Sequence, residues 1–586
     1  MGAASSSSNF NHGYPSPGPQ LPTGQEVMDH VFFSSKTTWK EIREEREFDF
    51  IVIGSGPCGY GFVERIYRNN PKARILMIER GPFFLPEHFQ NLPLPFKNTL
   101  GGLSETFPWT LSIKTQNAEY IKWQHGMVPF FGGRSTLWSA WCPCPTPKEM
   151  RDWPPEVITV VQDYFSEAKK VLNVINADEI DADVCETSNC KRPIYGEMQK
   201  ILTKKIQDEQ TKVESLTRVI PAPLAVNDPN VPGIDFNKFA TPGPLLEIAE
   251  IQKERARNNN EGSFEIVTNC VVQRILQQAN HGQDNKMIAK AVALETSRGV
   301  VNIGEAKLIL AMGTLPPTTL LQNSFPNLVQ AGRRFTAHFI TSVAARIPRK
   351  DYEFREKLGD LELAAIYIAG EDKVVNRQFH IQMSVLSDRN PKKNAANALR
   401  HMPDVVATAS MAQLLSSEDY LVFICAVLGE LDESNTDNHF LRNGESDPTT
   451  NDTLQALEND VDATTWNTMD DSTFQVLEKI LSPKGAGRVE YWHGQPDDGK
   501  WLKERPRKDQ IRVPGLVHEG STLFIGKEDD PNAVVGLDYR PKGVENVYVT
   551  GGGLWPTSGS WNPTPTMVAL AQNLADRLCK KGNHNR

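Results

Sequence analysis

The chain has 586 residues, of which 23% are charged and 39% are hydrophobic, and its formal net charge is -9 at pH 7. A chain of this length can bury a large core, and we expect two closely joined domains. The negative net charge offers no basic footprint for nucleic acid, so no nucleic-acid partner is expected. No run of about eighteen apolar residues occurs, so no membrane-spanning helix is expected.

The N-terminal segment 1–45 is predicted to be disordered or extended, because its first 25 residues are rich in Ser, Gly and Pro and have little to bury. It lacks the apolar core of a secretory signal, which favours a cytoplasmic protein. Gly2 and Ser6 fit the N-myristoylation pattern, but no basic cluster or second acylation site accompanies them. A solvated tail is therefore the preferred interpretation.

The eight cysteines are scattered along the chain. They lack the spacing of a zinc site, so no metal is expected, and we interpret them as mostly reduced thiols. A disulfide between Cys185 and Cys190 is the alternative.

A glycine-rich turn follows the first strong strand signal. Phe48–Ile53 predicts a buried parallel strand and Cys58–Arg68 a helix. Between and after them, Gly54, Gly56 and Gly59 have the G-x-G-x-x-G spacing of a dinucleotide-binding turn. Gly54 permits the tight turn, Gly56 the close approach of a pyrophosphate, and Gly59 the close packing of helix on strand. The helix N-terminus adds unpaired N–H groups and a positive dipole end.

A second strand, Arg74–Ile78, ends at Glu79. This carboxylate lies about twenty residues after the last glycine, where a dinucleotide-binding unit holds a ribose hydroxyl. Strand, turn, helix, strand and acid in this order predict a dinucleotide site. The alternative is an ordinary βαβ unit with a glycine-rich turn.

The stretch 81–147 is irregular and rich in Pro, Gly and aromatic residues, and it is too apolar for a linker. Inside it, Phe131–Trp141 combines paired glycines with small hydroxyl side chains. Such a backbone suits close contact with a flat ring system. A compact surface loop anchored by tryptophan is the alternative.

The next segments alternate between helical and strand patterns. Residues 155–210 have helical periodicity and predict surface helices. Strands are expected at 264–272, 291–296 and 307–314, followed by a short helical run at 318–322. A nucleotide domain assembled from both ends of the chain would use them as returning strands.

The middle of the chain, roughly 340–510, contains alternating strands, among them 378–383 and 420–427. It has no motif that carries chemistry by itself. The acidic segment 432–475 is expected to be a mobile loop or short helices at the surface, with a lid as the alternative.

The C-terminal part restores the nucleotide-domain pattern. A strand at 546–550 runs into the glycines 551–553, and a helix is expected at 567–575 with Thr566 as its N-cap. A glycine-rich turn that leads to a helix N-terminus is a second candidate site for an anion or a carbonyl.

His518 and Asn562 lie outside any helical or strand pattern that would bury them for packing. An imidazole near its ordinary pKa can accept the proton of an alcohol, and an amide can hold the substrate oxygen. A structural or surface role for His518 is the alternative, and the sequence alone does not bring the two residues together.

These segments together resemble the glucose–methanol–choline (GMC) flavoprotein oxidoreductases, and most closely their pyranose-oxidase branch. Gly132–Trp138 resembles the G-G-x-S-T-H-W of that branch. The glycines 551–553, followed by Pro556, Thr557 and 562–564, resemble its closing pattern. The resemblance is strong over 46–145, 260–340 and 510–580 and poor across the middle.

The resemblance implies an α/β fold with a discontinuous Rossmann-like FAD-binding domain and a second, α+β substrate-binding domain on a mainly antiparallel sheet. The FAD-binding domain is expected to comprise 46–150, 215–340 and 510–586. The other expected units are a helical insertion at 151–214 and the substrate-binding domain at 341–509.

The resemblance also implies roles for single residues. It places the FAD pyrophosphate at Gly54, Gly56 and Gly59 and the adenosine ribose at Glu79. His518 takes the position of the base that removes the hydroxyl proton, and Asn562 that of its partner. The remaining expected cofactor contacts are Arg134, Ser135, Thr136, Trp138, Ser139, Val272, Gly553, Asn562, Pro563 and Thr564.

One departure from the branch is Leu137, which stands where the branch has the histidine that bonds covalently to the flavin. Leucine cannot form that bond, so noncovalent FAD is expected. The electron acceptor, oxygen or another molecule, stays open, and a homo-oligomer is compatible with the sequence.

The expected reaction is FAD-dependent oxidation of an alcohol to a carbonyl, with a sugar or glycoside as the favoured small-molecule substrate. The alternatives are a family member that uses FAD for a net non-redox lyase or cyclase reaction and, with less support, a nicotinamide-dependent dehydrogenase.

Overall fold

The computed structural model describes residues 23–91, 106–124, 126–180, 194–226, 238–259, 262–281, 287–394, 398, 402–403, 409–495 and 497–582. The expectations for Gly2 with Ser6 and for the pair Cys185 and Cys190 lie outside these residues. The described part has a mixed α/β fold, as expected. No helix in these ranges is long and apolar enough to cross a membrane.

The segment before the first strand contains two helices. Helix α1 (Gly24–Val31) begins with a capping box between Thr23 and Glu26. Helix α2 (Lys36–Glu44) begins at the N-cap Ser35 and buries Trp39 and Ile42. The prediction of a disordered or extended segment is therefore wrong for these helices, because capping and two buried side chains stabilise them.

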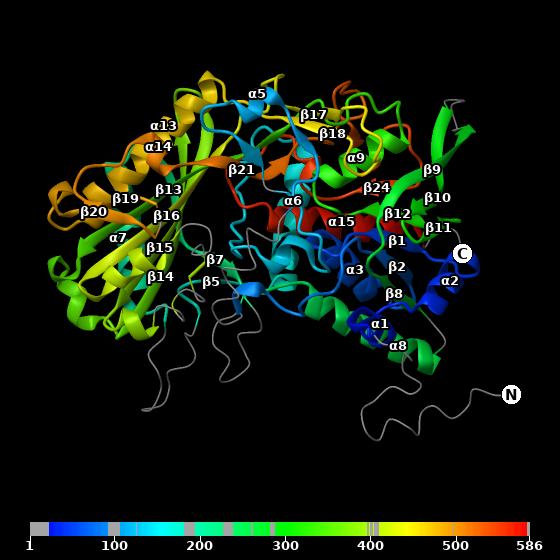
Figure 1. Ribbon diagram of the computed structural model, residues 1–586, viewed down its shortest axis with the longest axis horizontal. Coiled ribbons are helices and arrows are strands. Elements are labelled where there is room, and N and C mark those ends of the chain that lie inside the picture. Colours follow the sequence, from blue (N-terminus) through cyan, green and yellow to red (C-terminus); the bar gives the residue numbers. More distant parts are fainter. Residues whose placement is uncertain are drawn as a thin grey trace.

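Five parallel strands form the sheet that carries the glycine-rich turn, in the order β24–β12–β1–β2–β8. Their side chains are almost all buried, as in a parallel sheet with helices on both faces. Helix α15 packs against α3 and α6, and α8 packs against β8 (Figure 1). The bounds are β1 Phe50–Ile53, β2 Arg74–Ile78, β8 Ser263–Val267, β12 Lys307–Leu310, β24 Val547–Val549, α3 Pro57–Asn69, α6 Pro155–Val171, α8 Pro242–Asn259 and α15 Thr564–Gly582.

The expected strand at 264–272 is two strands. Strand β8 ends at Val267, and β9 begins at Val272 in a separate antiparallel sheet. The break contains Asn269, whose φ of 52° is left-handed and incompatible with an extended strand. The second sheet consists of β9 Val272–His281, β10 Met287–Thr296 and β11 Gly299–Asn302, and the following helix α9 spans Leu315–Ser324.

Helix α15 starts earlier than the sequence suggests. Thr566 was the expected N-cap, but the helix begins at Thr564, so that prediction is wrong. Pro565 does not prevent the early start, because a proline in the first turn lacks only an N–H that has no partner inside the helix.

A nine-stranded, largely antiparallel sheet forms the other side of the molecule, on the left in Figure 1. Its path is β20–β19–β13–β16–β15–β14–β6, with β21 on β13 and the short β4 parallel to β21. Strands β6 and β21 lie within ranges expected for the cofactor domain, and the domain boundaries stay a prediction. The bounds are β4 Trp123–Gln124, β6 Leu216–Pro221, β13 Thr336–Pro348, β14 Leu361–Asp372, β15 Arg377–Asp388, β16 Tyr420–Glu430, β19 Glu490–Gly494, β20 Gly499–Leu502 and β21 Arg512–Gly520.

The acidic segment 432–475 is mostly ordered structure. Helix α13 (Asp460–Gln475) begins with a capping box between Asn459 and Asp462 and buries Trp466 and Met469. It packs on β14, β15 and β16, so the expectation of a mobile loop or short surface helices is wrong for this helix. Some of the acidic residues that suggest a solvated loop lie on this helix, whose buried apolar side chains pack on the sheet.

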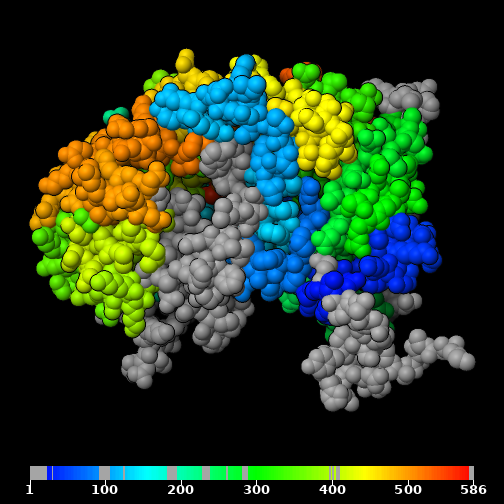
Figure 2. Space-filling model, viewed as in Figure 1, coloured from blue at the N-terminus to red at the C-terminus, as the bar shows by residue number. Residues whose placement is uncertain are grey.

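Two short strands, β3 and β4, lie between β2 and the loop 131–141 in the chain. Strand β3 (Thr110–Leu111) pairs with β18, and β4 pairs with β21. Figure 2 shows the light-blue atoms around α5 (Ile113–Gln116) between the orange atoms on the left and the green atoms on the right. The remaining elements are β5 Val174–Asn176, β7 Pro223–Ala225, β17 His439–Arg442, β18 Asp452–Gln455, β22 Ile525–Gly526, β23 Val535–Gly536, α7 Glu197–Glu209, α12 Met411–Leu414 and α14 Lys508–Ile511.

Candidate active site

A cavity of about 610 Å³ is lined by residues of both the parallel sheet and the nine-stranded sheet. Most of the residues predicted from the sequence line it. Three of the predicted residues, Gly59, Thr136 and Gly553, lie outside its lining. The predicted residues in the lining are Gly54, Gly56, Glu79, Arg134, Ser135, Trp138, Ser139, Val272, His518, Asn562, Pro563 and Thr564.

The three glycines of the turn have different surroundings. Gly54 has a φ of 102°, and a Cβ there would lie 2.6 Å from the carbonyl oxygen of Ala311. A Cβ on Gly59 would clash with the carbonyl oxygen of Gly54, so this position needs glycine for helix–strand packing. At Gly56 the nearest atom to an added Cβ is the carbonyl oxygen of Gly132 at 3.9 Å. Gly56 therefore borders open space in the cavity.

Glu79 closes this turn through hydrogen bonds to its carboxylate. Oε2 accepts from the backbone N–H of Ser55 at 3.1 Å and from its hydroxyl at 2.7 Å. Oε1 accepts from the backbone N–H of Gly81 at 2.9 Å. Burial raises the pKa of Glu79, and these hydrogen bonds oppose the increase. The carboxylate both shapes the turn and lines the cavity.

The loop 131–141 is fastened to the glycine-rich turn. The backbone N–H of Gly132 donates to the Ser55 hydroxyl at 2.8 Å, and the Ser135 hydroxyl donates to the Gly132 carbonyl at 2.7 Å. Thr136 instead donates its hydroxyl to the Gly133 carbonyl at 2.8 Å, within the loop. The loop lines the cavity and is not the isolated surface loop that was the alternative.

Arg134 connects this loop to the end of β21. Its Nη1 donates to Oε2 of Glu519 at 3.0 Å, and its Nη2 lies 2.9 Å from Oε1. Trp138 donates its indole N–H to the carbonyl oxygen of Phe239 at 2.7 Å. Because Glu519 follows His518 directly, the Arg134 ion pair helps to fix the position of the histidine.

His518 contacts a second histidine that the sequence did not indicate. Its Nδ1 lies 2.9 Å from Nδ1 of His338 on β13, and the two rings are nearly perpendicular, at 88°. One of these nitrogens donates and the other accepts, so one proton lies between them. Burial lowers the pKa of His338 to about 4, which keeps it neutral at pH 7.

The backbone of His518 is left-handed, with a φ of 59°. Such a conformation costs a residue with a side chain about 1–2 kcal/mol, and residues of this kind cluster at functional sites. The residue is neither extended like the rest of β21 nor fully buried. The backbone of His518 is therefore strained, and the packing of its side chain does not account for this strain.

Asn562 lies in the loop before α15 and is buried. Its Oδ1 accepts from Nε2 of Gln382 on β15 at 2.6 Å. This orientation leaves the Nδ2 group of Asn562 as its hydrogen-bond donor toward the cavity. Gln382 itself lines the cavity.

Two helix N-termini meet this cavity. Pro57 begins α3 and Thr564 begins α15, and both residues line it. The first N–H groups of a helix have no partner inside the helix, and the dipole makes this end positive. The cavity can therefore bind an anion at two places.

His338, His380 and Gln382 are functional candidates that sequence reasoning missed. On β15 polar residues alternate with apolar ones, yet both faces of the strand are buried. A buried polar face is uncommon. The alternation on β15 was therefore the sequence pattern that could have indicated His380 and Gln382. His380 stacks on Tyr367 with ring centroids 4.9 Å apart, and burial lowers its pKa well below the ordinary value.

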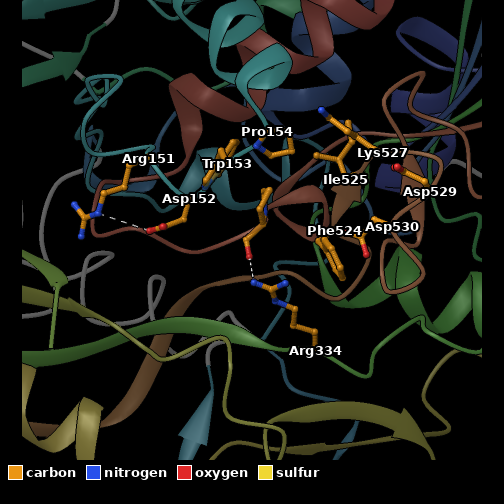
Figure 3. A pocket seen from close by; sticks show the side chains of 12 residues that line it. Arg151, Asp152, Trp153, Pro154, Arg334, Phe524, Ile525, Lys527, Asp529 and Asp530 are labelled. Atoms are coloured by element: carbon orange, nitrogen blue, oxygen red, sulfur yellow. Dashed lines mark hydrogen bonds and ion pairs between the residues drawn. The ribbon is translucent and has the colours of Figure 1, made fainter.

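A second cavity of about 390 Å³ is shown in Figure 3. Its cationic groups already have partners. Arg334 donates to the carbonyl oxygen of Pro556 and lies over the ring of Phe524, while Lys527 forms an ion pair with Glu156 at 3.2 Å. None of the site residues predicted from the sequence lines it. The larger cavity is therefore the candidate active site.

The described residues contain no group of three or more His, Cys, Asp or Glu that could hold a metal ion. All six cysteines in these ranges are free thiols.

Comparisons with known proteins agree with this architecture. Residues 366–571 match the family model described as GMC oxidoreductase. The crystal structure of pyridoxine 4-oxidase from Mesorbium loti is similar with a TM-score of 0.56 and 16% sequence identity, over 92% of this chain and 100% of that chain. At this identity the likeness shows the fold.

A curated relative matches over a short segment. Dehydrogenase pkfF of Emericella nidulans is 41% identical over 68 residues, which are 12% of this chain and 11% of the relative's length. The family model covers the sheet from β14 onward and the loop that carries Asn562. Residues 366–571 are therefore similar to GMC oxidoreductases, and the structural likeness shows a shared fold.

Proposed function

We propose that the protein binds FAD and oxidises an alcohol to a carbonyl compound. One observation carries the proposal: His518 and Asn562, which are 44 positions apart in the chain, line the same cavity as the glycine-rich turn. A base, an amide donor and a dinucleotide-type turn around one cavity are the parts that a flavin-dependent alcohol oxidation needs.

The residues present fit FAD. Open space beside Gly56 and the N-terminus of α3 suit a pyrophosphate.

We assign the parts of the cofactor as follows. Gly54 and Gly56 hold the pyrophosphate, Glu79 the ribose and Val272 the adenine side. The flavin ring is held by Trp138, Ser139 and the loop 562–564. Leu137 lines the cavity and carries no group that could bond to the flavin, so we propose noncovalent binding. When bound, FAD supplies the acceptor for the hydride and is reoxidised by oxygen or another acceptor.

The protein's own residues then hold and move the proton. We place the shared proton on Nδ1 of His518, with Nδ1 of the neutral His338 as its acceptor. Nε2 of His518 is thereby left without a proton and accepts the one from the substrate hydroxyl. The Nδ2 group of Asn562 donates to the substrate oxygen and orients it.

The finer expectations from the resemblance belong to this proposal. They are the pyranose-oxidase branch and a His518 base; the sugar or glycoside expected from the resemblance is not retained as the substrate, for the reasons given in the next subsection. A non-redox lyase or cyclase reaction is the competing outcome, and the same experiment distinguishes it.

The test is the absorbance spectrum of the purified protein, followed by anaerobic addition of alcohols. We expect a flavin band at about 450 nm that one class of alcohol bleaches, because hydride transfer reduces the flavin. A colourless protein would contradict FAD binding. A yellow protein that no alcohol bleaches would contradict alcohol oxidation and favour the non-redox reaction.

A further inference from the structure

We propose that the substrate alcohol has an apolar body, aromatic or branched aliphatic, and is not a sugar. This inference rests on the proposed function, because it concerns the substrate of the same site. It is carried by the side chains that the nine-stranded sheet contributes to the cavity.

Strand register brings apolar side chains together at this wall. Ile340 on β13 is paired with Leu428 on β16 and with Val513 on β21. Directly opposite residues of paired strands share a face of the sheet, so these three side chains are neighbours. All three line the cavity, as does Val517 on β21. The wall beside His518 is therefore a continuous aliphatic surface.

The polar groups at this wall are few. Gln382 is paired with Ala426 in the same sheet, and its Nε2 is already bound to Asn562. Asn562 and His518 then supply one donor and one acceptor, which suffice for a single hydroxyl group.

Three further polar side chains in the cavity lining are engaged with the protein. Glu519 is paired with Arg134, and Glu79 accepts from Ser55 and Gly81. The Thr319 hydroxyl accepts from the indole N–H of Trp109 at 3.1 Å. A sugar would bring several hydroxyls to a wall with hydrogen-bonding groups for about one, and each unpaired hydroxyl would lose its bonds to water. An apolar substrate body has no hydrogen bonds to lose at this wall, and its transfer from water to the cavity is favourable.

The first experiment compares alcohols on the FAD-loaded wild-type enzyme. Benzyl alcohol, 3-methyl-1-butanol and D-glucose are added anaerobically, and the rate of flavin bleaching gives kcat/KM for reduction. We expect the better apolar alcohol to exceed D-glucose by about 100-fold or more, because unpaired polar groups discriminate strongly. Faster bleaching by D-glucose would overturn the inference and leave the proposed function standing. Bleaching by none of them would count against the proposed function.

The second experiment measures binding, independently of turnover. Calorimetry gives the Kd of benzaldehyde, the product of benzyl alcohol, for the wild type, Leu428→Ala and Leu421→Ala. Both leucines are buried on β16, but only Leu428 lines the cavity. We expect Leu428→Ala to weaken binding about tenfold, since it removes apolar contact with the ligand, and Leu421→Ala to leave it within about twofold. An equal effect of the two variants, or none from Leu428→Ala, would overturn the inference.

Discussion

The two walls of the cavity differ in how far apart their residues lie in the chain. The glycine-rich wall is formed by residues 53–58 and 78–80, which belong to one strand–helix–strand unit. The opposite wall comes from β13, β15, β16 and β21 and from the loop before α15, with side chains between Ile340 and Asn562. A site formed by a local turn can be recognised in the sequence from the spacing of its residues. A site formed by pairing of strands that are distant in the chain has no such spacing.

The comparison also separates two kinds of constraint. At Gly54 and Gly59 the constraint is steric, because a Cβ meets backbone that cannot move. At His518 and Asn562 it is chemical, because each ring or amide needs a particular hydrogen-bonding partner. Substitutions of the glycines should therefore impair folding or FAD binding, whereas substitutions of the opposite wall should slow the reaction.

The largest effect is expected at the base. His518→Ala should slow flavin reduction by about 10³-fold, within the range of general base catalysis, while FAD content stays unchanged. Anaerobic stopped-flow absorbance measures the rate, and His493→Ala, at a histidine of β19 outside the cavity, is the control. Reduction of His518→Ala at the wild-type rate would remove this residue from the mechanism.

The glycine-rich wall can be tested with two substitutions that differ only in position. Gly59→Ala should destabilise the fold by about 2 kcal/mol, because its Cβ overlaps the Gly54 carbonyl oxygen. Gly56→Ala should leave the fold intact and reduce FAD content, because its Cβ enters the open space of the cavity.

Urea unfolding of the apoprotein and flavin absorbance per protein measure these two effects. Gly487→Ala, where an added Cβ meets nothing within 4 Å, is the control for both. If Gly56→Ala kept its full flavin content, the pyrophosphate would not lie at this turn.

The histidine pair predicts a pH dependence of stability. The pKa of His338 is about 4 in the fold and 6.5 in the unfolded chain, so between these values the unfolded state binds more protons. The free energy of unfolding should therefore fall as the pH decreases from 7.5 to 5, by about 2 kcal/mol from this residue.

Urea unfolding at both pH values should show that His338→Asn loses about 2 kcal/mol less than the wild type, because asparagine does not titrate. The same variant should slow flavin reduction about tenfold, since His518 loses its neutral partner. Equal pH dependence in the two proteins would show that His338 is not a buried neutral group.

The last prediction, with the smallest expected effect, concerns Leu137, which lines the cavity and has no reactive group. Acid precipitation of the holoprotein should release all of the flavin into the supernatant, as measured by absorbance. Flavin that stays with the pellet would show a covalent bond to another residue, and peptide mapping of the pellet would identify it.

Most strands of the parallel sheet could be predicted because they are short apolar runs that end at glycine or an acid. The predictions failed where the local sequence pattern suggested one structure and the folded chain adopted another. The acidic composition of 432–475 suggested a loop, but Trp466 and Met469 anchor α13 to the sheet. Thr566 was expected to cap α15, yet a proline in the first turn let the helix begin at Thr564.

The glycine-rich turn and the acid that closes it can be identified from the amino-acid sequence, because both depend on neighbours within about thirty positions. His518 and Asn562 can be named from the resemblance. The contact of His518 with His338, the orientation of Asn562 by Gln382, and the aliphatic wall of Ile340, Leu428 and Val513 are seen in the folded chain alone. The physical reason is that a β-sheet places side chains by cross-strand register, and register joins residues whose separation in the chain carries no local pattern.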